Sequence, residues 1–118
     1  MAPTGKSLDQ SQLLKGVLDM AVLAVLSGED GYGYDVVRRL RAAGLTDVAE
    51  ASVYGTLRRL FADGALSSYV VPSEEGPHRK YYGLTDAGRT QLQALASTWG
   101  AFSGVIASLI NGSTQGGD

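Results

Sequence analysis

The sequence contains no cysteine and a single histidine, His78. Without cysteine there is no disulfide scaffold, no thiolate ligand for a metal and no cysteine nucleophile. No GxSxG motif and no paired-carboxylate arrangement is present, and His78 lies in a stretch typical of a turn. We therefore expect a protein that is not an enzyme and that has no catalytic residue, no metal site and no cofactor.

Long hydrophobic runs are also scarce. The longest apolar stretch, residues 13–26, is too short to span a membrane and is interrupted by Lys15 and Asp19. The first ten residues contain no apolar segment of the kind found in signal peptides. We expect no membrane span, a cytoplasmic location and a flexible arm over residues 1–10.

Charge is low and slightly negative, which counts against nucleic-acid binding. The formal net charge is −2 and charged residues make up 19% of the chain, whereas 44% of its residues are hydrophobic, as in a globular domain. The distribution of the charges favours a local basic face, because most of the cations lie in one stretch. Seven of the ten basic residues fall there: Arg38, Arg39, Arg41, Arg58, Arg59, Arg79 and Lys80.

Apolar residues at helical spacing predict a first helix over residues 13–26, ended by Gly28. A second helix follows Gly31-Tyr32-Gly33-Tyr34 and ends at Gly44. Its apolar residues (Val36, Val37 and Leu40) predict a buried stripe, and its arginines (Arg38, Arg39 and Arg41) an exposed face. The glycines before it do not form a dinucleotide-binding loop, because neither a preceding strand nor a third glycine is present.

The segment Ser52–Gly64 predicts the helix around which the rest of the chain is organised. Ser52 is a good N-cap, and Gly64 suits the left-handed position that ends a helix. At 100° per residue one side is apolar (Val53, Leu57, Leu60 and Phe61) and the other is small or basic (Gly55, Arg58, Arg59 and Ala62). The basic side suits duplex DNA, although an ordinary amphipathic helix with solvated arginines explains the pattern equally well.

Two β-rich segments, residues 66–71 and 79–84, predict a hairpin around the turn at 72–78. Alternation places Arg79 on one face and Lys80 on the other, so one cation stays outside to meet phosphate whichever face packs inward. Of the tyrosines Tyr69, Tyr81 and Tyr82, we expect at least one to pack the hairpin onto the helices.

A long last helix is predicted from the N-cap Thr85 to Asn111, with Gly112 beyond it and residues 113–118 as a tail. Its large apolar residues are spaced 3, 4, 3, 4, 3, which is the seam of a coiled coil. The seam consists of Leu92, Leu95, Trp99, Phe102, Ile106 and Leu109. The predicted organisation is therefore a domain over 11–84, mainly α with a β-hairpin, followed by a dimerisation helix over 85–112.

Three segments in this order resemble the PadR family of bacterial transcriptional regulators: GYGYDVVRRL (31–40), ASVYGTLRRLFADGAL (51–66) and GPHRKYYGLTDAG (76–88). The single C-terminal helix is similar to that of the smaller subfamily. The chain departs from the family at Val53-Tyr54-Gly55, where relatives usually have Leu-Tyr-Pro, and at residues 31–34, where many have His-Gly-Tyr. The first departure affects the expected base preference, because Gly55 lies on the proposed DNA face.

The resemblance implies a winged helix-turn-helix homodimer that binds double-stranded DNA at a pseudo-palindromic operator, usually as a repressor. Matching the family's motifs assigns major-groove and nearby phosphate contacts to Ser52, Tyr54, Gly55, Thr56, Arg58 and Arg59, and wing contacts to Arg79 and Lys80. A winged-helix module that binds protein instead of DNA is the alternative, because a fold alone does not determine a function.

The last helix is also similar to that of the family's multidrug-sensing branch. That similarity implies a small, flat, aromatic effector held at the dimer interface between paired Trp99 side chains. The matching positions are Asp19, Met20, Leu92, Leu95, Ala96 and Ser103. The alternative is that Trp99 only packs the dimer seam and that the regulator responds to no ligand.

Overall fold

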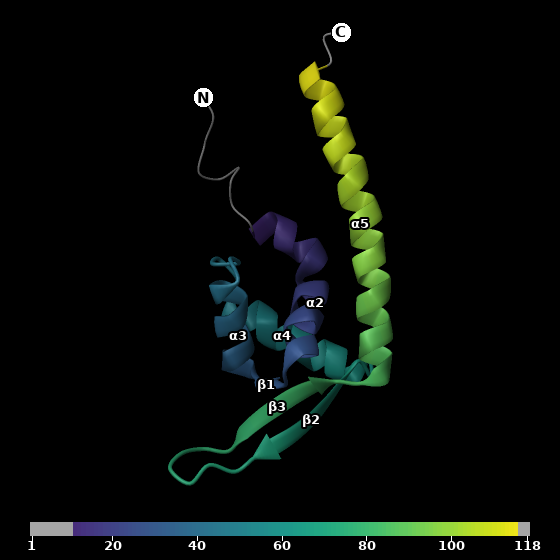
Figure 1. The fold of residues 1–118 in the computed structure, drawn as a ribbon. Helices are drawn as coiled ribbons and strands as arrows, with labels where there is room; N and C mark the ends of the chain where they lie inside the picture. The colour runs from purple at the N-terminus through teal and green to yellow at the C-terminus, as the bar shows by residue number, and fades with distance from the viewer. Residues whose placement is uncertain (1–10, 116–118) are drawn as a thin grey trace.

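The computed structural model describes residues 11–115 of the chain, so the predicted arm at 1–10 lies outside the described residues. Three helices pack together, a small sheet lies at one end of them, and a long last helix extends away from both (Figure 1). In order the elements are α2 (Ser11–Gly28), β1 (Gly31–Tyr32), α3 (Gly33–Ala42), α4 (Glu50–Ala62), β2 (Leu66–Val71), β3 (Arg79–Leu84) and α5 (Asp86–Gln115).

Glycines end two of these helices, as predicted. Gly44 follows α3 with a φ of 124°, and Gly64 follows α4 with a φ of 87°. A side chain is strained in this left-handed region, whereas glycine is not. After α4, the N–H of Ala65 donates to the carbonyl of Leu60 at 2.9 Å, which closes the helix end and directs the chain into β2.

The predicted start of α4 is wrong. The helix begins at Glu50, and its N-cap is Ala49, whose backbone is extended and which makes no side-chain capping bond. Ser52 therefore lies inside the helix, where its N–H donates to the carbonyl of Ala49 at 3.1 Å. The acidic side chain of Glu50 in the first turn interacts favourably with the helix dipole, in place of a capping hydroxyl.

The hairpin has the predicted strands, and it is part of a three-stranded antiparallel sheet in the order β1-β3-β2. The additional strand, β1, pairs Gly31 with Tyr82 and Tyr32 with Tyr81. Two residues are too few for a periodic pattern, so this strand was not predicted.

The core lies between the three packed helices and the inner face of β3. Tyr82, which is only 6% exposed, packs the hairpin onto this core and so turns the Lys80–Tyr82 face inward. On α4 the buried stripe is Val53, Thr56, Leu57 and Leu60. Phe61 was expected in that stripe but is 45% exposed, and its ring lies 5.5 Å from the ammonium nitrogen of Lys80.

The first part of α5 is fastened to this domain. Thr85 caps the helix as predicted: its hydroxyl accepts the N–H of Gly88 at 3.0 Å and donates to the carbonyl of Gly64 at 2.7 Å. Leu92 and Leu95 then pack against the core. The predicted end at Asn111 is wrong, since the helix runs on through Gly112, whose φ is not positive, to Gln115.

Beyond Leu95, α5 leaves its own domain and exposes several large apolar side chains: Trp99, Phe102, Val105, Ile106, Leu109 and Ile110. By length and composition alone, residues Asp86–Gly112 could cross a membrane, with a mean hydropathy of 1.2, which was not expected from the sequence. One such helix is weak evidence for a membrane protein. What the helix does require is a cover for its apolar side chains.

Candidate nucleic-acid interface

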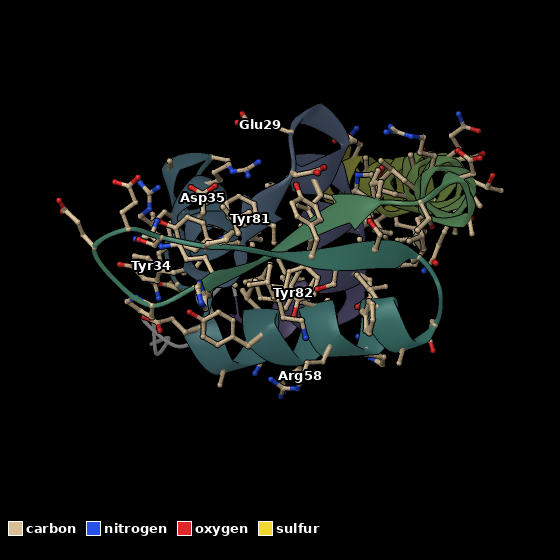
Figure 2. All side chains as sticks on the ribbon, turned by 90° about the horizontal axis from the view of Figure 1, so that it is seen from below. Glu29, Tyr34, Asp35, Arg58, Tyr81 and Tyr82 are labelled. Carbon is tan, nitrogen blue, oxygen red and sulfur yellow. The ribbon has the colours of Figure 1, made fainter. Side chains whose placement is uncertain are left out.

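A groove of about 430 Å³ lies where the N-terminus of α3, the outer side of α4 and strand β3 meet. Figure 2 shows Tyr82 between the hairpin and α4, with Arg58 on α4. Three basic and four tyrosine side chains line the groove, together with one glycine: Tyr32, Gly33, Tyr34, Tyr54, Arg58, Arg79, Lys80 and Tyr82.

The three cations of the groove carry uncompensated charge. Among the residues that the structure describes, Arg58, Arg79 and Lys80 form no ion pair. Aromatic rings support two of them: the guanidinium of Arg79 lies 4.5 Å from the centre of the Tyr32 ring, and the Lys80 ammonium 5.7 Å from that of Tyr82. A ring holds a cation without neutralising it, so this surface favours an anionic partner.

Several residues of α4 that were predicted to contact DNA share this surface. Tyr54 and Arg58 line the groove, and Gly55 is half-buried beside them. Ser52 is exposed but lies about 200° around the helix from Tyr54, and it lines a separate hollow with Leu14 and Lys15 of α2. A Cβ atom at Gly55 would lie 3.9 Å from the Arg58 guanidinium, so the glycine keeps the backbone accessible beside that cation.

Thr56 does not belong to this surface. Only 6% of the residue is exposed, because it lies on the side of α4 that packs against the core. Two residues along a helix rotate the side chain by about 200°, so Thr56 faces away from Tyr54. The predicted DNA contact at Thr56 is therefore wrong.

Arg59 has a partner that the sequence did not suggest. Its guanidinium donates to both carboxylate oxygens of Asp19 on α2, at 2.7 and 2.9 Å. This hydrogen bond raises the pKa of Arg59 above its ordinary value and keeps the side chain fully charged. The pair joins a residue predicted to contact DNA to one predicted to line the effector cavity.

The predicted exposed face of α3 is only partly correct. Arg38 is exposed, whereas Arg39 is half-buried and donates to the backbone carbonyls of Val25, Glu29 and Asp30 and to the Asp35 carboxylate. Arg41 donates to the carbonyl of Val48, just before α4, at 3.0 Å. These two arginines fix α3 to its neighbours. Asp35, four residues before Arg39, is the one feature of the sequence that could have indicated this.

The contribution of residues 32–34 was not predicted from the sequence. A Cβ atom at Gly33 would lie 2.6 Å from the Tyr54 ring, so the glycine allows α3 and α4 to approach closely. Burial, followed by the charge of Glu50 and the neighbouring phenol of Tyr34, raises the pKa of Tyr54. The Gly-Tyr repeat at 31–34 was the available signal.

None of the residues predicted to hold an effector lines the groove. Trp99 is 45% exposed, and its ring centre lies 6.4 Å from that of Phe102. Met20 and Ser103 are half-buried, Ala96 is exposed, and the Ser103 hydroxyl donates to the carbonyl of Gly100. The described residues contain no group of three or more His, Asp or Glu side chains that could hold a metal ion.

Three packed helices, with unpaired cations on the third helix and on the adjoining hairpin, define a winged helix-turn-helix protein of the DNA-binding class. Residues 22–94 match the family described as the transcriptional regulator PadR-like family. The match covers more than half of the chain, and the chain belongs to this family. It is a DNA-binding transcriptional regulator, and the family consists of regulators rather than enzymes.

Solved structures of the same family are similar over most of their length. A PadR-like transcriptional regulator from Bacillus cereus is 37% identical, with a TM-score of 0.74 over 84% of this chain and 96% of that one. A PadR family regulator from Eggerthella lenta is 29% identical, with a TM-score of 0.79 over 92% and 97%. Among curated proteins, an uncharacterized protein from Lysinibacillus sphaericus is 27% identical over 82% of this chain and 91% of its own.

Proposed function

We propose that the protein is a cytoplasmic, homodimeric repressor that binds a pseudo-palindromic operator through α4 and the wing formed by β2 and β3. The observation that carries the proposal is the groove, where Arg58, Arg79 and Lys80 gather without carboxylate partners among the described residues. Phosphate contacts position such a protein on the duplex, and the side chains of α4 read the bases. Ser52, Tyr54 and Gly55 are the α4 residues proposed for contacts in the major groove and to nearby phosphates, Gly55 through its backbone.

The apolar side chains of α5 support the homodimer. Phe102 is 58% exposed and Leu109 63% exposed in the single chain, which is costly in water. Both lie on the predicted seam, which a second copy of the same helix would cover. A two-fold axis along the seam would present two copies of α4 to half-sites about 34 Å apart.

Replacing Arg58 with alanine tests the DNA-binding surface. We expect Arg58→Ala to weaken operator binding and to reduce the slope of log affinity against log salt by about one unit for each phosphate that the variant no longer neutralises. Arg38→Ala is the matched control, because Arg38 is also exposed but is paired with Asp35 outside the groove. Titrations of a fluorescent operator duplex at several salt concentrations would measure both. Equal decreases in affinity for the two variants would contradict the assignment.

We further propose that a small, flat, aromatic ligand binds between the two copies at Trp99 and lowers operator affinity. Two features support a cavity there: Trp99 is partly exposed beside Phe102, and its neighbours Ala96 and Gly100 are small. The Asp19–Arg59 ion pair physically links α2, which carries two of the predicted effector residues, to α4. A ligand that prefers one separation of the α5 helices would shift the population of dimers competent to bind DNA.

The emission of Trp99 tests this proposal directly, because the chain has only one tryptophan. Titration with flat aromatic dyes should quench that emission and saturate at one ligand per dimer, with a parallel decrease in operator affinity. A blue emission that does not respond would make Trp99 a packed seam residue and the protein a regulator independent of such ligands.

A further inference from the structure

We propose that the groove binds one phosphodiester of the DNA backbone, which the wing and α4 contact simultaneously. The phenols of Tyr34 and Tyr54 are hydrogen-bond donors to this phosphodiester, beside the cations. This inference rests on the DNA-binding function proposed above and assigns a role to α3, which has none in the residue set derived from the sequence. The wing and α4 then act on a single phosphate instead of probing two separate parts of the duplex.

The shape of the groove suits a segment of a polymer. Its walls come from three segments far apart in the sequence: residues 32–34, α4 with Tyr54 and Arg58, and β3 with Arg79, Lys80 and Tyr82. Its volume of about 430 Å³ is in the range of small-molecule sites. The groove is open to solvent, so the backbone of a DNA strand can enter it without threading an end.

The charge of the groove suits a phosphate. Three cations line it and no carboxylate does. Two acids adjoin residues of the groove without lining it: Asp35, next to Tyr34, is paired with Arg38 and Arg39, and Glu50 precedes Tyr54 by one helical turn. An anion that enters the groove therefore meets no competing carboxylate on its walls.

The phenols add donors that an arginine patch lacks. A phenol is protonated at physiological pH and can donate, and burial raises the pKa of Tyr54 further above its ordinary value. Tyr34 and Tyr54 both line the groove, so both phenols border the space that a phosphate would enter. A hydroxyl that donates to a phosphate oxygen makes a charge-assisted hydrogen bond, which is stronger than a neutral one.

The test uses an operator duplex selected from a random-sequence pool and a set of copies, each carrying one neutral methylphosphonate. The variant is Tyr34→Phe, which removes only the hydroxyl. Tyr69→Phe is the control, because the Tyr69 phenol lies on the wing but donates to Asp30 at 2.6 Å and does not line the groove. Thermal unfolding of each variant establishes that it is folded.

We expect Tyr34→Phe to bind about tenfold more weakly, as is typical when a hydrogen bond to a charged group is removed, while Tyr69→Phe binds like the wild type. One methylphosphonate position should weaken the wild type strongly and Tyr34→Phe hardly at all, because both changes remove the same interaction. Wild-type affinity of Tyr34→Phe, or equal decreases for both proteins at every methylphosphonate position, would overturn the inference. If Arg58→Ala still weakens binding in that case, the DNA-binding function stands without the phosphate site.

Discussion

Arginines of this chain differ in role because of their neighbours and not because of their type. Arg58 and Arg59 are adjacent in α4, yet Arg58 lines the groove without an ion pair among the described residues, whereas Arg59 is held by Asp19. On α3, Arg38 and Arg39 share Asp35, but only Arg39 reaches three backbone carbonyls. Arg39 thus supplies donors to carbonyl groups at the end of α2 and in the turn before β1.

The two arginines that share Asp35 should differ in their effect on stability. We expect Arg39→Ala to lower the free energy of unfolding by about 2 kcal/mol, because the half-buried Val25 carbonyl and Asp35 carboxylate lose a charged donor, as do two exposed carbonyls. Arg38→Ala should lower it by less than about 0.5 kcal/mol, since its ion pair is exposed to solvent. Urea unfolding followed by circular dichroism measures both. Indistinguishable midpoints would mean that the hydrogen bonds from Arg39 to the carbonyls contribute nothing.

At the scale of elements, the junction between the hairpin and α5 depends on close backbone approach. Gly88 lies in the first turn of α5, and a Cβ atom there would collide with the backbone carbonyl of Ala65, just before β2. The N–H of Thr85 also donates to that carbonyl, at 3.1 Å. These interactions set the direction in which α5 leaves the domain, and with it the position of the wing relative to the seam.

Alanine should therefore have opposite effects at two helical glycines. We expect Gly88→Ala to destabilise the protein by about 1–3 kcal/mol, as overpacking against a rigid backbone does. Gly16→Ala in α2, where a Cβ atom would meet nothing within 4 Å, should stabilise it by about 0.5–1 kcal/mol. Thermal unfolding of the two variants provides the comparison. A stable Gly88→Ala protein would show that the junction is able to shift.

The whole molecule is elongated because α5 extends beyond the domain. The radius of gyration is 17.4 Å, compared with about 13 Å for a compact chain of 100 residues. The principal extents are 65 × 33 × 20 Å, and the long one follows α5 (Figure 1). A helix in this position buries little by itself, and its exposed seam residues are the reason for proposing a second copy.

A charge in the seam should dissociate the proposed dimer without unfolding the domain. Ile106 is 40% exposed in the single chain, so Ile106→Glu leaves the core intact but places two carboxylates at the two-fold axis. Ser97→Glu is the control, because residue 97 is exposed and outside the seam. Sedimentation should give a monomer for the first variant and a dimer for the second. Operator affinity should fall only for the monomer, which is unable to engage two half-sites simultaneously.

Much of this architecture could be predicted from local patterns. The strands of the hairpin, the glycines that end α3 and α4, the Thr85 cap and the regular spacing along α5 all depend on residues a few positions apart. Backbone freedom, capping and periodicity act over that range, so these elements could be predicted without knowledge of the packing. Arg58 on the outer side of α4, and Arg79 and Lys80 on opposite faces of β3, were predicted for the same reason. The periods of a helix and of a strand determine the direction of successive side chains.

Which side chains remain available to a partner depends on how the elements pack against one another. Strand β1 exists because Gly31 pairs with Tyr82, and Arg59 is engaged because Asp19, 40 residues earlier, lies opposite it. Thr56 is buried because α4 packs on the other helices, and the groove forms where residues 32–34 meet α4 and β3. Interactions of this kind depend on how the elements are packed, and periodicity within one element contains no information about its neighbours.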